Sequence, residues 1–441
     1  MPPRRSLTRR HSSLHPTDAQ TYWISSKIPN DQFLLYCFDT DTDSTAESVR
    51  GEVLHNAADI EQLQLRIADV PLDLGYPRTR SMRLDAAHVL DHGQPGDWGA
   101  CLSELGTLFR EQLDQHETTW RLHLFTAVTG APRCTGAALV AVLQISHALG
   151  DGRVASSLAR RLFGDADTPV FDPPARGRFR PIEFIRRSRR AHELDQRLAA
   201  DTDAGKVPAQ APPRPRTRLN LAPSEAVSIR TVVRDRADLT APGISVTAGA
   251  LTVVSAALSR YLEIHGDRVP SDLGAEVTIA KPGERRARNH FRNAGVGLFP
   301  ETDDLFERAG SIAAALADRR ARAEHPAMAA GALATEMVPA VLLHWGVRQF
   351  DATAVPDAVT GHTVVSSVAR GAATLRLGGG PVRFTAGFPA LSPVMGLTHG
   401  VHGIGDTVTF GITSAASAVP DPDVYETILR EAADDVAGAF G

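Results

Sequence analysis

Short apolar runs and stretches with helical spacing alternate along the first third of the chain. The run at residues 137–145 is almost entirely apolar, which is typical of a strand that is buried on both faces. After Gly152 the apolar positions recur every three or four residues, so a helix is expected to begin there. The predicted strands are residues 32–38, 121–125 and 137–145, and the predicted helices are one ending near Ile60, residues 102–113 and the one after Gly152.

A second series of helices and strands follows a stretch that is rich in Arg and Pro. Its predicted helices are residues 248–264, 305–323, 336–350 and a last one opened by Asp421, and its predicted strands are residues 275–280, 363–368, 382–387 and 407–413. We therefore divide the chain into an N-terminal tail (1–14), a first lobe (15–164), a linker (165–224) with one helix at 182–200, and a second lobe (225–441). The alternation predicts an α/β fold with two lobes of similar size.

Acidic residues alternate over residues 39–43, directly after the first predicted strand. They do not form an EF-hand loop, because that loop needs Gly and Glu at the positions that Ser44 and Arg50 occupy. Ser44 and Glu47 have the spacing of a capping box instead. We expect a turn here, followed by the N-terminus of a helix.

Composition narrows the classes of function. The formal net charge of −4 makes nucleic acid an unexpected partner, because a phosphate-binding chain is normally basic. The three cysteines lie far apart and form neither a CxxC pair nor a disulfide framework, so a reducing, cytoplasmic location is expected. No apolar run reaches the roughly 18 residues that a membrane-spanning helix needs.

Contact with a membrane surface is an alternative for two basic stretches of the chain. The tail holds four arginines but no apolar segment of a secretory signal, so it is expected to be disordered, or alternatively to be attracted weakly to an anionic membrane. The cluster at residues 186–190 is expected to be the solvated face of a helix. Its alternative is a contact for a phosphate-bearing donor or for the inner membrane surface, where the protein would be peripheral.

The segment 146–152, Ser-His-Ala-Leu-Gly-Asp-Gly, carries the candidate chemistry. His147 follows the end of a buried strand, which is a rigid position for a general base, and acyl transfer to a hydroxyl or amine needs such a base. Asp151 is close enough to brace the loop, for example through an arginine, and Gly152 allows a tight turn or a close backbone approach. No GxSxG nucleophile accompanies the segment, which favours direct transfer without an acyl-enzyme. The alternative is a loop histidine that only caps the strand end.

Several segments resemble the bacterial wax ester synthase/acyl-CoA:diacylglycerol acyltransferase (WS/DGAT) family, within the superfamily of chloramphenicol acetyltransferases and condensation domains. Residues 14–19 (Leu-His-Pro-Thr-Asp-Ala) are similar to the family's opening Leu-Ser-Pro-x-Asp, and Leu113-Asp114 through Thr119-Trp120 to its Leu-Asp … Pro-Leu-Trp stretch. Residues 146–152 match His-His-x-x-x-Asp-Gly in all but the first position. Phe410-Gly411 and Val419-Pro420-Asp421 are similar to its closing strand and last helix.

The resemblance implies two chloramphenicol-acetyltransferase-like lobes with a substrate channel between them, and acyl-CoA as a co-substrate, with no other cofactor. It implies that His147 takes the proton of the acceptor hydroxyl, that Asp151 is structural, and that Ser146 lies at the first histidine of the pair. The sequence departs from the family at Thr247-Ala248, where Asn-Asp is usual, and at Ser366-Ser367-Val368, where Ser-Asn-Val is usual. Asn293 falls at the asparagine of the family's Gly-Asn element. We expect Ser146, Asn293, Ser366 and Ser367 to bind substrate.

Two other segments were weighed for chemistry. His399 and His402 lie three residues apart without a third ligand nearby, so we expect a Gly-rich loop or a channel lining there, and no metal site. Residues 281–286, Lys-Pro-Gly-Glu-Arg-Arg, are expected to form a charged surface loop. The alternative is that this loop meets the phosphates of the donor.

The leading hypothesis is an O-acyltransferase that moves an acyl group from acyl-CoA to an alcohol, with a divergent acceptor in specialised or lipid metabolism. The second is a condensation-type enzyme that uses a carrier-protein thioester to form an ester or amide. The third is a non-catalytic acyl- or lipid-binding protein that keeps the fold.

Overall fold

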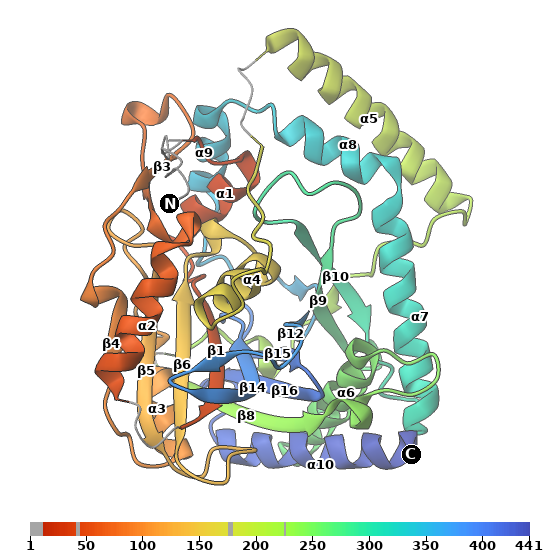
Figure 1. Ribbon diagram of the computed structural model, residues 1–441. Coiled ribbons are helices and arrows are strands. Elements are labelled where there is room, and N and C mark those ends of the chain that lie inside the picture. The colour runs from red at the N-terminus through yellow and green to blue at the C-terminus, as the bar shows by residue number, and fades with distance from the viewer. Residues whose placement is uncertain (1–11, 41–44, 175–179, 225) are drawn as a thin grey trace.

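The computed structural model describes residues 12–40, 45–174, 180–224 and 226–441 (Figure 1). Its α-helices are α1 (Pro16–Ile24), α2 (Ala46–Ala58), α3 (Trp98–Leu108), α4 (Gly152–Leu162), α5 (Pro181–Asp203), α6 (Val246–Ile264), α7 (Leu305–Glu324), α8 (Pro326–Thr335), α9 (Ala340–Gln349) and α10 (Pro422–Phe440). Its strands are β1 (Gln32–Asp39), β2 (Leu65–Ala68), β3 (Arg78–Ser81), β4 (Val89–Asp91), β5 (Trp120–Val128), β6 (Ala138–Ile145), β7 (Arg214–Pro215), β8 (Val227–Asp235), β9 (Gly274–Ala280), β10 (Phe291–Gly297), β11 (Ala358–Val359), β12 (Thr363–Ala369), β13 (Arg376–Leu377), β14 (Gly380–Phe388), β15 (Leu397–Ile404) and β16 (Thr407–Ala415).

The first large sheet has the strand order β13-β14-β1-β6-β5-β4. Alternate residues of β6 belong to two different cores: Leu139, Ala141 and Leu143 pack with α2 and α4, whereas Val140 and Val142 pack with α3 and with β8 of the other sheet. Both faces of β6 are therefore covered, which explains its nearly continuous apolar sequence. The strand is antiparallel to both neighbours, β1 and β5.

The second large sheet has the strand order β10-β9-β12-β15-β16-β8. One face packs against α6, α7 and α10, which lie to the right of and below the sheet in Figure 1. Most of α6 is buried there, with every residue from Ala248 to Leu258 covered, in keeping with the largely apolar sequence of this helix. The α/β class and the two-lobed architecture expected from the sequence are both present.

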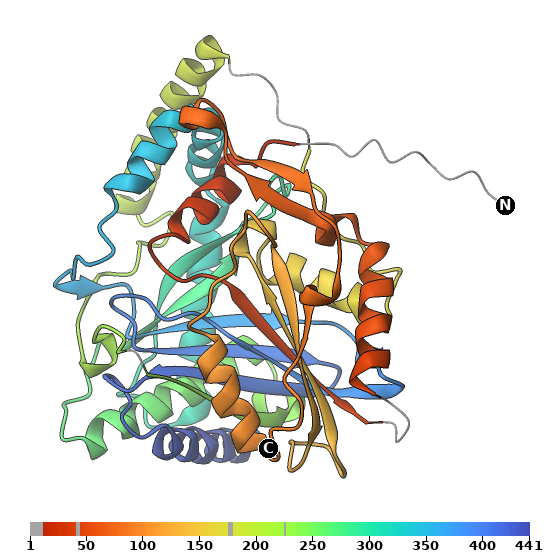
Figure 2. The same ribbon diagram turned by 90° about the vertical axis from the view of Figure 1, so that its left-hand side faces the viewer.

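The two sheets meet where β14 crosses β15 and β16. Close approach requires glycine at this crossing: a Cβ on Gly400 would lie 1.9 Å from the carbonyl oxygen of Gly387, and one on Gly411 would lie 2.4 Å from the same atom. Figure 2 shows β15 and β16 running behind the strands of the first half. Although β14 follows residue 225, it pairs with β1, so this segment of the expected second lobe completes the first sheet. The lobe boundaries themselves stay a prediction.

Most predicted elements are present, with shifted ends. The predicted strands all occur, as do the helices 182–200, 248–264 and 305–323. The helix predicted at 102–113 instead begins at Trp98, because the Asp97 side chain caps it, and ends at Leu108. The helix predicted at 336–350 was wrong at its start, because Pro339 is the N-cap of α9 and separates it from α8.

Other local predictions need correction. The capping box predicted for Ser44 and Glu47 is formed by Thr45 and Ser48, and Ser44 lies outside the described residues. The Gly-rich loop predicted around His399 and His402 is strand β15, whose backbone is buried between β12 and β16. Its glycines are typical of a loop in the sequence, but Gly400 is needed for the crossing with β14.

Helix α5 is packed and does not hang free within the linker. Its Leu194 and Leu198 lie against Ala327 of α8, and the two helices run together across the top of the molecule in Figure 1. The arginine cluster at residues 186–190 forms ion pairs with glutamates of the same helix, as Arg186 and Arg187 do with Glu183, consistent with a solvated helix face. The tail at residues 1–11 lies outside the described residues.

Within the described residues, no single helix has the length and apolar character to cross a membrane, although the bent pair of α8 and α9 together meets that criterion. The angle between these two helices is 105°. Contact with a membrane surface stays a prediction.

Replacing Gly400 with alanine should destabilise the protein by about 1–3 kcal/mol or more, because the new methyl group meets the backbone of β14 and the sheets must separate. Gly310 on the exposed surface of α7 is the matched control, since a Cβ there meets nothing within 4 Å and alanine should stabilise the helix by ~0.5–1 kcal/mol. Chemical denaturation of both variants measures the two changes. Equal stability of the Gly400→Ala variant and the unmodified protein would contradict this account of the crossing.

Candidate active site

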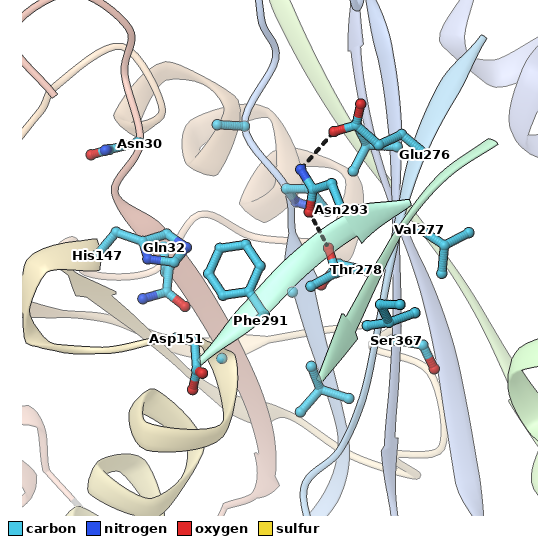
Figure 3. A pocket seen from close by; sticks show the side chains of 18 of the residues that line it. Asn30, Gln32, His147, Asp151, Glu276, Val277, Thr278, Phe291, Asn293 and Ser367 are labelled. Carbon is cyan, nitrogen blue, oxygen red and sulfur yellow. Dashed lines mark hydrogen bonds between the residues drawn. The ribbon is translucent and has the colours of Figure 1, made fainter. Parts of the chain in front are cut away.

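A cavity of about 890 Å³ lies between the two sheets. The segment before β1, the start of α4, and β9, β10, β12 and β14 all contribute to its lining. His147 projects into it from the end of β6, and Phe291 of β10 faces His147 (Figure 3). The two rings are 5.6 Å apart between centroids. The space expected between the lobes is thus present, and His147 opens onto it.

The turn that carries His147 is held by Ser146. The Ser146 hydroxyl donates to Gln115 Oε1 at 2.5 Å and accepts from the backbone N–H of Ala148 at 3.1 Å. The side chain is fully buried and does not line the cavity. The hydrogen bonds of Ser146 are used within the protein, where they fix the short 3₁₀ turn at residues 147–149, and binding of substrate by Ser146 stays a prediction.

Asn289 orients the His147 ring. Its Nδ2 donates to the carboxylate of Asp18 at 3.0 Å and to the carbonyl of His147 at 2.8 Å. Both partners only accept hydrogen bonds, so the amide oxygen of Asn289 must be the atom that faces His147 Nδ1, at 2.7 Å. Nδ1 therefore carries the proton in the neutral ring, and Nε2 keeps its lone pair. A base that presents Nε2 to the cavity is what proton abstraction needs.

Asp18 fixes Asn289 in turn. The carboxylate is completely buried and accepts from the backbone N–H groups of Arg288 and Asn289, at 3.1 and 2.9 Å, in addition to the Asn289 side chain. It lies on α1, at the aspartate of the opening motif in residues 14–19. A buried carboxylate with three N–H donors is well satisfied, so it can hold the Asn289 amide in one orientation.

Asp151 braces the same region from the other side. One oxygen caps α4 through the N–H groups of Arg153 and Val154, each at 3.2 Å. The other accepts from Arg285 Nη2 at 2.9 Å and from the backbone N–H of His290 at 3.0 Å. The arginine that the sequence suggested as a brace is Arg285. Among the described residues, Asp151 makes hydrogen bonds to the start of α4, to Arg285 and to His290, and none to His147. A structural role for Asp151 stays a prediction.

Burial lowers the pKa of His147 below its ordinary 6.5, although the hydrogen bond with Asn289 opposes the shift by favouring the charged ring. The imidazole is neutral at pH 7 and can accept a proton. Nε2 forms no hydrogen bond to another described residue, so the lone pair is available to a molecule in the cavity.

The remaining predicted residues line the cavity at different places. Gly152 approaches Val368 closely, since a Cβ on it would lie 3.2 Å from that side chain. Asn293, Ser366 and Ser367 are all in the lining. Thr247 Oγ1 and Ser367 Oγ lie 3.0 Å apart, so two of the departures from the family's motifs touch each other. Binding of substrate by these residues stays a prediction.

Residues of the other two candidate segments, at His399 and His402 and at 281–286, contact side chains elsewhere in the protein. His399 is fully buried between Thr363 and the hydroxyl of Tyr425, at 2.9 and 2.8 Å, whereas His402 lines the cavity. No group of three metal-ligating side chains occurs among the described residues. In the loop at residues 281–286, Arg285 pairs with Asp151 and Arg286 with Glu336, so both guanidinium groups already have protein carboxylates as partners.

Asn289 could not be predicted from the sequence. It lies far from His147 in the chain and has no motif around it, so only the folded structure brings the two together. Asp18 could have been found, because it is the aspartate in the opening segment that carried the resemblance. Arg285 was within a segment that had been singled out for its charge.

Comparison with known proteins confirms the resemblance and the fold. Residues 289–435 match the family model of the WS/DGAT C-terminal domain. No curated protein matches the sequence significantly. The structure is similar to that of the wax ester synthase/diacylglycerol acyltransferase from Marinobacter aquaeolei VT8, with a TM-score of 0.63 and 19% identity over 97% of this chain and 100% of that chain.

Condensation domains share the same fold. The first condensation domain of the CDA synthetase has a TM-score of 0.58 at 14% identity, over 98% of both chains. The starter condensation domain of rhizomide synthetase RzmA, in complex with C8-CoA and Leu-SNAC, has a TM-score of 0.57 at 13% identity, over 98% of this chain and 95% of that chain. At these identities the likeness establishes the two-lobed fold and leaves the reaction to be argued from the site.

The pKa of His147 should lie below 6.5, because burial disfavours the imidazolium. NMR of protein with histidine labelled at Cε1, titrated from pH 8 to pH 4, measures it, and the His147→Gln variant identifies the signal by its loss. Nitrogen chemical shifts near neutral pH should show the tautomer with hydrogen on Nδ1. A pKa above 6.5, or hydrogen on Nε2, would contradict the geometry derived for Asn289.

Proposed function

We propose that the protein is an acyltransferase in which His147 is the general base and a thioester is the acyl donor. The observation that carries this proposal is the fixed tautomer of His147, whose unprotonated Nε2 opens onto the cavity between the lobes. The hydrogen bonds of Asn289 and Asp18 maintain this state, and the lowered pKa keeps the ring neutral at physiological pH. The match to the WS/DGAT C-terminal domain supports the same class of reaction.

In the proposed reaction, Nε2 removes the proton from the acceptor hydroxyl as its oxygen attacks the thioester carbonyl carbon. A carbon–oxygen bond forms, and the carbonyl electrons move onto oxygen. When they return, the carbon–sulfur bond breaks, and the thiolate takes the proton from Nε2 of His147. The products are an ester and a free thiol, and the base is restored. No side chain is acylated, in keeping with direct transfer.

Acyl-CoA is the proposed donor, and the acceptor is an alcohol. A starter condensation domain with the same fold was crystallised with C8-CoA, which supports a medium-length acyl chain as a first probe. The alternative donor is a thioester on a carrier protein, which would make the enzyme condensation-like. Exchanging octanoyl-CoA for an octanoyl carrier protein, with the acceptor held constant, distinguishes the two donors.

Release of free CoA from octanoyl-CoA in the presence of an alcohol should fall by roughly 10²–10⁴-fold in the His147→Ala variant, because the general base is lost. Ser146→Ala is the neighbouring control: it removes a hydroxyl that faces away from the cavity, so it tests damage to the turn. Circular dichroism and thermal unfolding verify the folding of both. Full activity of His147→Ala would refute the role of the base, and ligand binding without turnover in the unmodified protein would favour a non-catalytic acyl-binding protein.

Replacing Asn289 with alanine should lower kcat by about 10–100-fold and change KM for the donor little, because the ring loses the partner that orients it. The hydrogen bond that the Asn289 oxygen accepts from Nδ1 raises the pKa of His147, so its loss should lower that pKa further. The acid limb of the kcat/KM profile should therefore move to lower pH. General damage to the structure would lower the rate without moving this limb, and an unmoved limb would contradict a positioning role for Asn289.

A further inference from the structure

Glu276 is an acidic side chain in the lining of the cavity, on the second sheet. It lies on β9, where Val277 and Ile279 point into the core and the alternate residues Glu276 and Thr278 point into the cavity (Figure 3). Asn293 of the neighbouring strand donates from Nδ2 to Glu276 Oε1 at 2.6 Å. The Asn293 oxygen accepts from the hydroxyl of Thr278 at 3.4 Å, which fixes the amide with its N–H groups toward the carboxylate.

The carboxylate of Glu276 has no ion-pair partner among residues 12–40, 45–174, 180–224 and 226–441. Burial raises its pKa, and the hydrogen bonds that oppose the shift come from the uncharged Asn293 and Thr360. The guanidinium of Arg214 lies beside Gly295, the residue paired with Glu276, but it donates to the carbonyls of Asp272 and Thr360. A partly buried carboxylate without a cation is costly, and a bound cation would offset that cost.

The separation between Glu276 and His147 along the cavity defines the length of a molecule that can contact both. Phe291 faces His147, and Gly295, four residues further along β10, is paired with Glu276. At about 3.3 Å per residue, the carboxylate lies roughly 10–13 Å along the cavity from the level of the base. A single acceptor of that length would reach both groups.

We infer that Glu276 binds a positively charged amine on the acceptor, so that the acceptor is an amino alcohol whose hydroxyl and ammonium groups are separated by about the length of an eight-carbon chain. This inference rests on the proposed function, because it assigns the far end of the molecule whose hydroxyl His147 deprotonates. The ammonium group donates to the carboxylate of Glu276, and the hydroxyl reaches Nε2 of His147. Long-chain alcohols without a charge, and diacylglycerol, leave the carboxylate unpaired.

Competition between two acceptors of similar length tests the inference. With octanoyl-CoA as donor, kcat/KM for 8-aminooctan-1-ol should exceed that for nonan-1-ol, and Glu276→Gln should reduce the ratio by about 10–100-fold, as expected when a charged hydrogen bond is lost. The matched control is Glu324→Gln on α7: this glutamate also borders the cavity but is exposed, so its charge is screened and the ratio should change little. Alkaline hydroxylamine, which cleaves the ester product and spares the amide, verifies that the hydroxyl was acylated.

A binding measurement separates this inference from the proposed function. Calorimetric titration of 8-aminooctan-1-ol into the protein without thioester should show binding that Glu276→Gln weakens and Glu324→Gln does not. Turnover of nonan-1-ol with equal or higher kcat/KM, or a preference for the amino alcohol that survives in Glu276→Gln, would overturn the role of Glu276 and leave the acyltransfer intact. Absence of turnover with every acceptor would refute the proposed function, and the calorimetric comparison would still decide whether Glu276 binds the amine.

Discussion

The site depends on one set of hydrogen bonds between the halves of the chain. Residues 285–290 belong to the second half, yet they bind Asp18 and Asp151 of the first half, and Asn289 within them binds His147. Both carboxylates are almost fully buried. A buried carboxylate without these donors would be strongly destabilising, so the segment and the two acids hold each other in place. The orientation of the base is thus set by the docking of one lobe on the other.

Strands and helices whose formation depends on residues close in sequence could be predicted from the local pattern of apolar and polar positions. The apolar run before His147 predicted a buried strand, and the apolar spacing after Gly152 predicted the helix that follows Asp151. Strands β10 and β15 were missed because asparagine, glycine and histidine are poor strand formers on their own. Their glycines and polar side chains serve contacts with other parts of the fold, such as the close crossing at Gly387 and Gly400. Asn289 and Glu276 acquire meaning only from partners that are distant in sequence.

Two departures from the family's motifs, Thr247 and Ser367, lie on the side of the cavity away from the base, whereas a third, Ser146, lies beside the base. Thr247 and Ser367 touch each other on the second sheet and its helix α6, whereas the network around His147 uses Asp18, Asn289 and Asp151. Within the described part of the chain, no hydrogen bond joins the two groups. A change in the lining therefore leaves the tautomer and orientation of the base intact, and the acceptor can differ while the proton transfer remains the same.

The carboxylates near the base and the carboxylate of Glu276 in the lining also differ in how their charges are compensated. On the side of the base, Asp18 is compensated by three N–H donors, and Asp151 by Arg285 as well as backbone donors. On the side of the lining, Glu276 has only uncharged hydrogen-bond donors. Groups that must stay fixed gain from complete pairing within the protein, since this removes alternative arrangements. A group that binds a ligand must keep part of its hydrogen-bonding capacity unused, and Glu276 meets that condition.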